Sequence, residues 1–299
     1  MSTALALGTF DGVHLGHRAV IAAARQAVGE AGQVTAVTFW PHPMTVFAPA
    51  AAPPLLQGLD AREDALLDAG ADEILVLHFT PAMAALSPGQ FVESILVPMA
   101  PSVVAVGPSF TFGDRGAGTP ATLSQLAAGR FGVDIADLVA IGGCDVSSSA
   151  IRAALARGDV GLANRFLGRD FAVRGLVVRG DQRGRALGFP TANLAPADGL
   201  AAPGDGVYAG WLRRLDEPAG RGLAPAGRHA MPAAVSVGDN PTFASSRRIE
   251  AHVLDAELDL YGSEVEIGFS RRLRGMVKFS NVEDLVSQMR QDVEQVRDH

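Results

Sequence analysis

The residues with the clearest chemical potential form one string near the start of the chain, directly after a short apolar run. The string reads Gly8-Thr-Phe-Asp-Gly-Val-His-Leu-Gly-His17. Its glycines allow a sharp turn and a close approach of the backbone to a ligand. A helix that begins here would direct free N–H groups and the positive end of its dipole at the same place. We therefore expect a nucleotide-phosphate site made by Gly8, Phe10, Asp11, Gly12 and Gly16.

Two histidines in this string, His14 and His17, lie three residues apart and so share one face of the first helical turn. Their imidazoles can donate hydrogen bonds to phosphate oxygens and share the charge of a departing pyrophosphate. The string offers no nucleophile activated by a base, so the chemistry it suits is direct in-line nucleotidyl transfer. Two alternatives remain open: a glycine-rich turn with two surface histidines, and a metal bound by both imidazoles, for which no third ligand is evident.

A second stretch, Ser147-Ser-Ser-Ala-Ile-Arg152, opens a predicted helix after the apolar run Leu138–Ile141. Ser148 and Ser149 can cap that helix and contact a phosphate, and Arg152 supplies a forked cation. Taken alone, the stretch is also compatible with an ordinary capped helix.

A second glycine-rich region, residues 178–193, is not a Walker A loop because it has no Gly-Lys-Ser/Thr. The positive charge that neutralises phosphates there must come from Arg183, Arg185 or Mg²⁺. Thr191 and Asn193 flank one residue, so their side chains point the same way in an extended chain. A hydroxyl and an amide carbonyl are hard oxygen ligands suited to Mg²⁺ that bridges to phosphates. The competing interpretation is a turn whose Thr and Asn satisfy backbone groups.

Glu250 lies in the predicted strand Ile249–Asp255 and shares a face with His252. A carboxylate that projects into a phosphate site can accept the proton of a substrate hydroxyl during phosphoryl transfer. Considered by itself, Glu250 is more typical of a solvated strand residue than of a catalytic base.

The elements that must position these residues differ between the two halves of the chain. The first half alternates short apolar runs with helical patterns, which predicts a parallel, Rossmann-like sheet covered on both faces. Ligands of such sheets bind beyond the carboxyl ends of the strands, where the first string falls. The predicted strands are Ala4–Leu7, Val34–Phe39, Ile74–Leu77, Val103–Val106 and Leu138–Ile141. The predicted helices are Arg18–Gly29, Ala61–Gly70, Pro88–Leu96 and Leu123–Arg130.

After Asp170 the pattern changes to β-branched, alternating runs with Gly and Pro between them, which indicates a small antiparallel barrel. One amphipathic helix, Asn281–Arg297, closes the chain, and Leu215–Arg228 reads as an exposed hairpin loop. We expect a helical joint at Ile151–Gly168 and domains at 1–168 and 169–299. The predicted barrel strands are Phe171–Arg179, Gly206–Arg214, Pro232–Val237, Arg247–Asp255 and Glu264–Arg272.

Composition narrows the class of protein. The 299 residues carry a formal net charge of −7 with no basic block, so we expect no nucleic-acid partner. The single cysteine, Cys144, excludes an internal disulfide. No apolar segment reaches the roughly 18–20 residues that span a bilayer, and no secretory signal opens the chain, so we expect no membrane partner and a cytoplasmic location. The oligomeric state is left open, a homo-oligomer included.

The first half resembles the FMN adenylyltransferase module of the bacterial bifunctional riboflavin kinase/FAD synthetases, in the nucleotidyltransferase superfamily. The resemblance rests on the string Gly8–His17, on Phe39-Trp-Pro-His-Pro43, on Val106-Gly-Pro-Ser-Phe-Thr-Phe-Gly113 and on Ser147–Arg152. It implies that His14 and His17 contact the ATP phosphates, with Ser148, Ser149 and Arg152 on the opposite wall. In the transfer step we expect His14, His17 and Arg152 to stabilise the departing pyrophosphate. Ser109 stands where the family usually has Asn or Asp, at a position tied to the flavin side of the adenylyl site.

The second half resembles the riboflavin kinase module through Gly184–Leu194, Gly206-Val-Tyr-Ala209, Val237–Phe243, Glu250-Ala-His and Asp259-Leu-Tyr-Gly262. The resemblance implies ATP contacts at Gly184, Arg185, Gly188 and Pro190. It also implies Mg²⁺ with ATP at Thr191 and Asn193, and Glu250 as the base on the riboflavin 5′-hydroxyl.

The family's later Leu-Arg…Lys-Phe-Asp pattern appears as Leu273-Arg274…Lys278-Phe279-Ser280, and we expect Arg274 on the flavin side. The function expected is phosphorylation of riboflavin to FMN and adenylylation of FMN to FAD, with ATP as co-substrate of both. Two alternatives remain: a riboflavin kinase with a weakened adenylyl module, and a non-catalytic flavin-binding regulator.

Overall fold

The computed structural model describes residues 2–180, 184, 187–197, 199–215, 230–239, 247–256 and 258–298. The chain forms two compact units. The first contains Met1–Pro53 and Leu59–Ser147, and the second contains Pro54–Gly58 and Ser148–His299. The helices of the expected joint, α7 (Ser148–Ala156) and α8 (Val160–Leu167), are therefore part of the second unit. None of the helices in the described ranges combines the length and apolarity that a membrane crossing requires.

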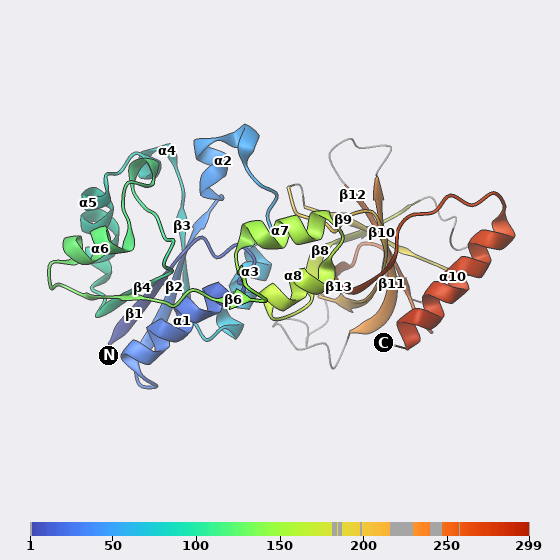
Figure 1. The fold of residues 1–299 in the computed structure, drawn as a ribbon, viewed down its shortest axis with the longest axis horizontal. Helices are drawn as coiled ribbons and strands as arrows, with labels where there is room; N and C mark the ends of the chain where they lie inside the picture. The colour runs from blue at the N-terminus through green and yellow to red at the C-terminus, as the bar shows by residue number, and fades with distance from the viewer. Residues whose placement is uncertain are drawn as a thin grey trace. The chain divides into compact units, whose positions relative to one another are not determined.

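The first unit is built on a five-stranded parallel sheet in the order β3-β2-β1-β4-β5. Strands β1 to β4 are labelled in Figure 1. Strand β2 shows why the sequence folds this way: its residues from Val34 to Phe39 are buried, as expected for a strand covered on both faces. Helix α1 packs against β1, β2 and β4. The strands are β1 (Thr3–Leu7), β2 (Gln33–Trp40), β3 (Glu73–His78), β4 (Val103–Val106) and β5 (Gly132–Ile135).

Shorter helical elements connect these strands, and the predicted parallel sheet with its helices is confirmed. The predicted helix Pro88–Leu96 is divided into an α-helical turn and a π-helical segment. The α-helices are α1 (Leu15–Val28), α2 (Pro43–Phe47), α3 (Leu59–Asp68), α4 (Pro81–Ala84), α5 (Pro88–Phe91) and α6 (Pro120–Ala127). The other turns are η1 (Pro49–Ala51), η2 (Val92–Leu96), η3 (Val97–Met99) and η4 (Asp114–Gly116).

The predicted fifth strand, Leu138–Ile141, is wrong. The fifth strand of the sheet is β5, which pairs with β4 in parallel. Only Ala140–Ile141 of the predicted segment is extended, as β6, and it pairs with β7 (Cys144–Asp145) in a two-stranded hairpin. The apolar run suggested a buried strand, but Leu138 is exposed. Gly142 and Gly143, both with positive φ, make the hairpin turn instead.

The second unit is a closed antiparallel barrel in the order β10-β11-β12-β9-β8-β13. The sequence pattern predicts five of these strands, and β9 is the addition, a short strand that pairs with both β8 and β12. Helices α7 and α8 pack on each other, and α8 also packs against β8 and β13. The strands are β8 (Phe171–Val178), β9 (Ala192–Pro196), β10 (Gly206–Arg214), β11 (Met231–Asp239), β12 (Arg247–Val253) and β13 (Glu264–Arg274). The predicted loop Leu215–Arg228 lies outside the described residues except for Leu215.

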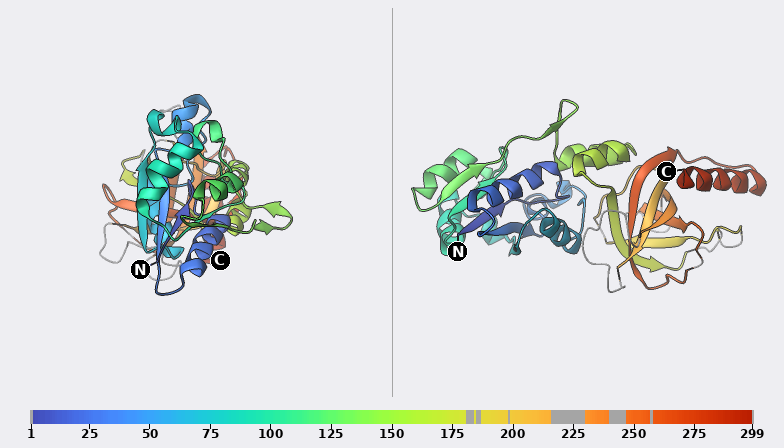
Figure 2. Two further views of the ribbon diagram at one scale, coloured as in Figure 1. Left: turned by 90° about the vertical axis from the view of Figure 1, so that its left-hand side faces the viewer. Right: turned by 90° about the horizontal axis from the view of Figure 1, so that it is seen from below.

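The C-terminal helix α10 (Val282–Arg297) lies on the outside of the barrel (Figure 2). It packs against β10 and β11, with Val296 buried beside Ala209 and Leu254. Arg274 fixes it further, since Nε lies 2.9 Å from Asp292 Oδ1 and Nη2 lies 2.7 Å from Oδ2. This bidentate pair joins β13 to the helix.

Asp292→Asn is expected to lower the free energy of unfolding of the second unit by about 2 kcal/mol, because Asp292 is only 3% exposed and one partner of a charge-assisted pair is lost. Urea unfolding followed by Trp211 fluorescence in a Trp40→Phe background measures this. The exposed Glu283→Gln on the same helix is the matched control, with a change within roughly 0.5 kcal/mol. Equal unfolding midpoints for the two variants would contradict the role of the pair.

Candidate functional sites

The turn after β1 has an unusual backbone. Phe10 and Val13 have φ of 53° and 38°, and Gly12 has φ of 89°. The left-handed conformation costs a non-glycine residue on the order of 1–3 kcal/mol, so it persists only where the surroundings impose it. Phe10 is fully buried, and a β-carbon on Gly8 would lie 3.1 Å from its ring. A side chain at position 8 would therefore crowd this ring.

His14 and His17 lie against each other at the start of α1. Their rings are stacked, with centroids 3.6 Å apart and an interplanar angle of 18°. His14 is the N-cap, and its Nδ1 accepts a hydrogen bond from the main-chain N of His17 at 3.3 Å. In the neutral ring this bond leaves the proton on Nε2, which makes Nε2 a donor. A β-carbon on Gly16 would lie 3.1 Å from the His14 ring, so glycine there makes room for it.

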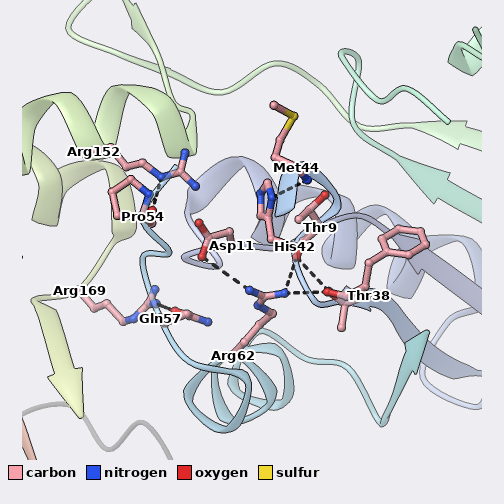
Figure 3. Close-up of polar contacts among 11 residues, drawn as sticks. Thr9, Asp11, Thr38, His42, Met44, Pro54, Gln57, Arg62, Arg152 and Arg169 are labelled. Carbon is pink, nitrogen blue, oxygen red and sulfur yellow. Dashed lines mark hydrogen bonds and ion pairs between the residues drawn. The ribbon is translucent and has the colours of Figure 1, made fainter. Parts of the chain in front are cut away.

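Asp11 is 2% exposed and lies inside the turn rather than on its surface. Its Oδ1 is 3.7 Å from Nη2 of Arg62, a fully buried residue of α3 (Figure 3). Burial lowers the pKa of Arg62, and the carboxylate of Asp11 acts in the opposite direction. The turn thus contains a buried ion pair that the sequence pattern does not indicate.

The carboxyl ends of β1, β2 and β4 meet at one edge of the sheet because these strands are parallel neighbours. The Gly8–His17 string follows β1, and Ser109 follows β4 in an exposed turn closed by the bond from Phe110 N to Gly107 O. Ligands of open α/β sheets bind at this edge. The predicted phosphate string and the predicted flavin-side residue are therefore brought to the same edge.

The predicted opposite wall is carried by α7 in the second unit. Ser148 is the first residue of α7 and Ser149 the second. Arg152, one turn later, donates from Nε to the carbonyl oxygen of Pro54 at 2.7 Å. The segment Pro54–Gly58 is part of the same unit, where Leu55 forms a bridge with Leu200. No sequence signal pointed to this segment as a neighbour of α7.

In the barrel, Glu250 of β12 stands opposite Asn193 of β9. Thr191 donates from Oγ1 to Glu250 Oε2 at 3.4 Å. Arg248 forms an ion pair with Glu250, and its Nη2 donates to Asn193 Oδ1 at 3.3 Å. Side chains two residues apart share a strand face, so Arg248 and Glu250 meet Thr191 and Asn193 on one surface. The structure therefore brings the predicted metal ligands and the predicted base together.

The loop before β9 closes on itself. The carbonyl oxygen of Gly184 accepts hydrogen bonds from Leu187 N and Phe189 N, at 3.0 and 2.8 Å. Gly188 has φ of 85°, a conformation that favours glycine. The Pro190 carbonyl oxygen lies 2.8 Å from Nδ1 of His252, which ties the loop to β12. Arg183 and Arg185 lie outside the described residues.

The donor set around Glu250 fits a hard divalent cation. It offers a hydroxyl, an amide carbonyl and one carboxylate, all oxygen ligands of the kind that Mg²⁺ prefers. No group of three or more His, Cys, Asp or Glu side chains capable of holding a metal occurs among the described residues. A cation here must therefore rely on substrate phosphates and water for its other ligands, and it must compete with Arg248 for these oxygens.

Sequence reasoning missed Arg248 and Arg62. The sequence could have indicated Arg248, because it stands two residues before Glu250 on a predicted strand and must share the face of Glu250. Arg62 had none, since its partners come from separate strands and loops. Arg274, predicted on the flavin side, is placed on the joint between β13 and α10, where its guanidinium engages Asp292.

The first unit combines a parallel sheet with a loop that contains glycines and a pair of histidines, and the second is a barrel with a Thr/Asn/Glu cluster. This combination is typical of a two-module transferase of phosphate-containing groups. The family model for FAD synthetase matches residues 1–150, and that for riboflavin kinase matches residues 167–299. The chain belongs to the family of bifunctional riboflavin kinases/FMN adenylyltransferases. It is an enzyme of both kinds, with ATP as substrate and FMN and FAD as products.

Relatives with that bifunctional name cover nearly the whole chain. The protein from Listeria monocytogenes is 36% identical over 98% of this chain and 91% of its own length. Those from Bacillus subtilis and Escherichia coli K12 are 34% and 35% identical, each over 96% of this chain and about 90% of their own. A crystal structure described as a macrolide-efflux protein from Streptococcus pneumoniae is similar over 100% of this chain and 94% of its own, with a TM-score of 0.86 and 30% identity.

Proposed function

We propose that the kinase reaction takes place at Thr191, Asn193 and Glu250. The observation that carries this is the placement of the three side chains on one surface, with Glu250 on β12, Asn193 on β9 and Thr191 directly before β9. Glu250 accepts the proton of the riboflavin 5′-hydroxyl as that oxygen attacks the γ-phosphorus of ATP and ADP leaves. Thr191 and Asn193 would hold Mg²⁺, which would neutralise part of the phosphate charge. Gly184, Arg185, Gly188 and Pro190 bind ATP alongside.

The adenylyl transfer, we propose, uses the turn at the start of α1. A phosphate oxygen of FMN attacks the α-phosphorus of ATP, and the bond to pyrophosphate breaks. His14 and His17 donate hydrogen bonds to the phosphates and stabilise the leaving group, since the chemistry needs positioning and charge stabilisation rather than a nucleophile on the protein. Ser148, Ser149 and Arg152 contact the ATP phosphates as well. The backbone of Gly8, Phe10, Asp11, Gly12 and Gly16 shapes the pocket.

Ser109 binds flavin at the adenylyl site. Arg274 contributes to the flavin side of the kinase site by fixing the position of the chain that follows β13. The catalytic domains are 1–168 and 169–299. The enzyme acts in the cytoplasm on small molecules, without a nucleic-acid or membrane partner, as a monomer or a homo-oligomer.

A time course of flavins separated by HPLC tests the proposed pair of reactions. With riboflavin, ATP and Mg²⁺, FMN is expected to rise first and FAD to follow, and chelation of the metal is expected to stop both. FMN that accumulates without FAD would instead favour a riboflavin kinase with a weakened adenylyl module, for which the serine at position 109 is the sequence reason. Tight flavin binding without ATP turnover would favour a non-catalytic regulator.

A further inference from the structure

The guanidinium of Arg62 touches main-chain groups from two segments, the turn after β1 and the end of β2. Its Nη1 donates to the carbonyl oxygen of Thr9 at 3.1 Å and to that of Phe39 at 3.2 Å (Figure 3). Its central carbon lies 5.3 Å from the centre of the Trp40 ring. A fully buried cation is unfavourable unless such groups compensate for lost hydration, so the position calls for a reason beyond packing.

Arg62 contacts the two residues on either side of Phe10, whose backbone is strained. Thr9 precedes Phe10 and Asp11 follows it, and Arg62 engages the first through its carbonyl oxygen and the second through its carboxylate. The carbonyl oxygen of Thr9 also accepts a hydrogen bond from Thr38 Oγ1 at 2.9 Å. These anchors oppose relaxation of Phe10 to an ordinary backbone conformation.

Phe10 in turn contacts the histidine pair. Its ring meets His17 edge to face, with centroids 5.2 Å apart, and His17 is stacked on His14. A change in the Phe10 turn would therefore be transmitted to both imidazoles. A misplacement of about 1 Å at a catalytic group can cost on the order of 10²-fold in rate.

We propose that Arg62, acting with Asp11, is a positioning residue for adenylyl transfer. It holds the turn at Phe10 and so sets the orientation of His14 and His17, without touching ATP itself. The proposal rests on the proposed role of the two histidines.

Arg62→Met tests this because it keeps the length of the side chain and removes every donor. FAD formation from supplied FMN is expected to fall about 10²-fold, chiefly in kcat, with a KM for ATP changed by less than about threefold. FMN formation from riboflavin in the same chain is expected to stay within about twofold, because Arg62 belongs to the other unit. Arg25→Met removes the arginine of a more exposed Arg–Asp pair in the first unit and is expected to leave both rates unchanged.

Two further measurements separate positioning from general stability. If Arg62 and Asp11 act as one unit, Arg62→Met with Asp11→Asn should lose no more FAD formation than Arg62→Met alone. NMR signals of the His14 and His17 imidazoles, assigned with single His→Gln variants, should shift in Arg62→Met while those of His252 do not. If Arg62→Met fails to fold, Arg62→Lys carries the test, with an expected loss of about tenfold because one ammonium cannot reach both carbonyl oxygens and the carboxylate.

Retention of more than half of the FAD-forming rate by Arg62→Met or Arg62→Lys would overturn the proposal, as would losses that multiply in the double variant. Parallel loss of FMN and FAD formation in a folded protein would also overturn it. Failure of the proposed histidine role is distinguishable, because His14→Ala would then retain FAD formation whatever Arg62 does.

Discussion

His14→Ala is expected to lower FAD formation from supplied FMN by about 10²–10³-fold, effectively abolishing it, and to leave FMN formation from riboflavin nearly intact. The physical reason is the loss of a preorganised donor. His14 Nδ1 accepts the cap bond of α1, so the neutral ring carries its proton on Nε2, which we propose donates to phosphate as charge moves onto pyrophosphate. Rates of FMN and FAD appearance by HPLC, each with its own flavin substrate, measure the two effects separately.

Loss of the cap alone destabilises a helix by about 0.5–2 kcal/mol, so a control must restore it. His14→Asn does this, because asparagine is a good N-cap without an imidazole. We expect His14→Asn to remain as defective in FAD formation as His14→Ala. Recovery of FAD formation in the asparagine variant would show that His14 acts only as a helix cap. Equal loss of both activities in the alanine variant would contradict the proposal of two separate sites.

Glu250→Gln is expected to have the opposite selectivity. FMN formation should fall by about 10²–10⁴-fold, mainly in kcat, because an amide cannot accept the proton of the riboflavin hydroxyl. FAD formation from supplied FMN should stay within about twofold. Glutamine keeps the size of the side chain and its place opposite Asn193, so the loss reports on the proton acceptor rather than on packing.

The matched control in the same barrel is Glu264→Gln, an exposed residue at the start of β13. It should leave both rates unchanged and verify that removal of one carboxylate is tolerated. If the Glu250→Gln enzyme formed FMN at the rate of this control, Glu250 would not be the base. The Thr191/Asn193 pair would then lack its proposed base.

The two predictions share one design, since each variant contains its own control in the reaction that it should spare. This follows from the division of the chain, in which the histidine pair and the Glu250 cluster belong to different compact units. The selectivity of each loss therefore carries more information than its size.

By itself the amino-acid sequence determined the change from an alternating α/β pattern to a barrel, and it located the two motifs that we propose bind phosphate. These features are local. A glycine-rich turn, a pair of histidines three apart and the Thr-x-Asn pair each depend on neighbours in the chain, so their types and spacing are sufficient to predict them.

Tertiary structure alone decided which charged groups support those motifs. Arg62 reaches Asp11, Arg248 joins Glu250 to Asn193, and Arg274 holds Asp292. It also decided that β5, rather than Leu138–Ile141, completes the parallel sheet. In each case the partners are brought together by strand order, register or helix docking, and the energy of a buried charge depends on partners whose positions no local pattern specifies.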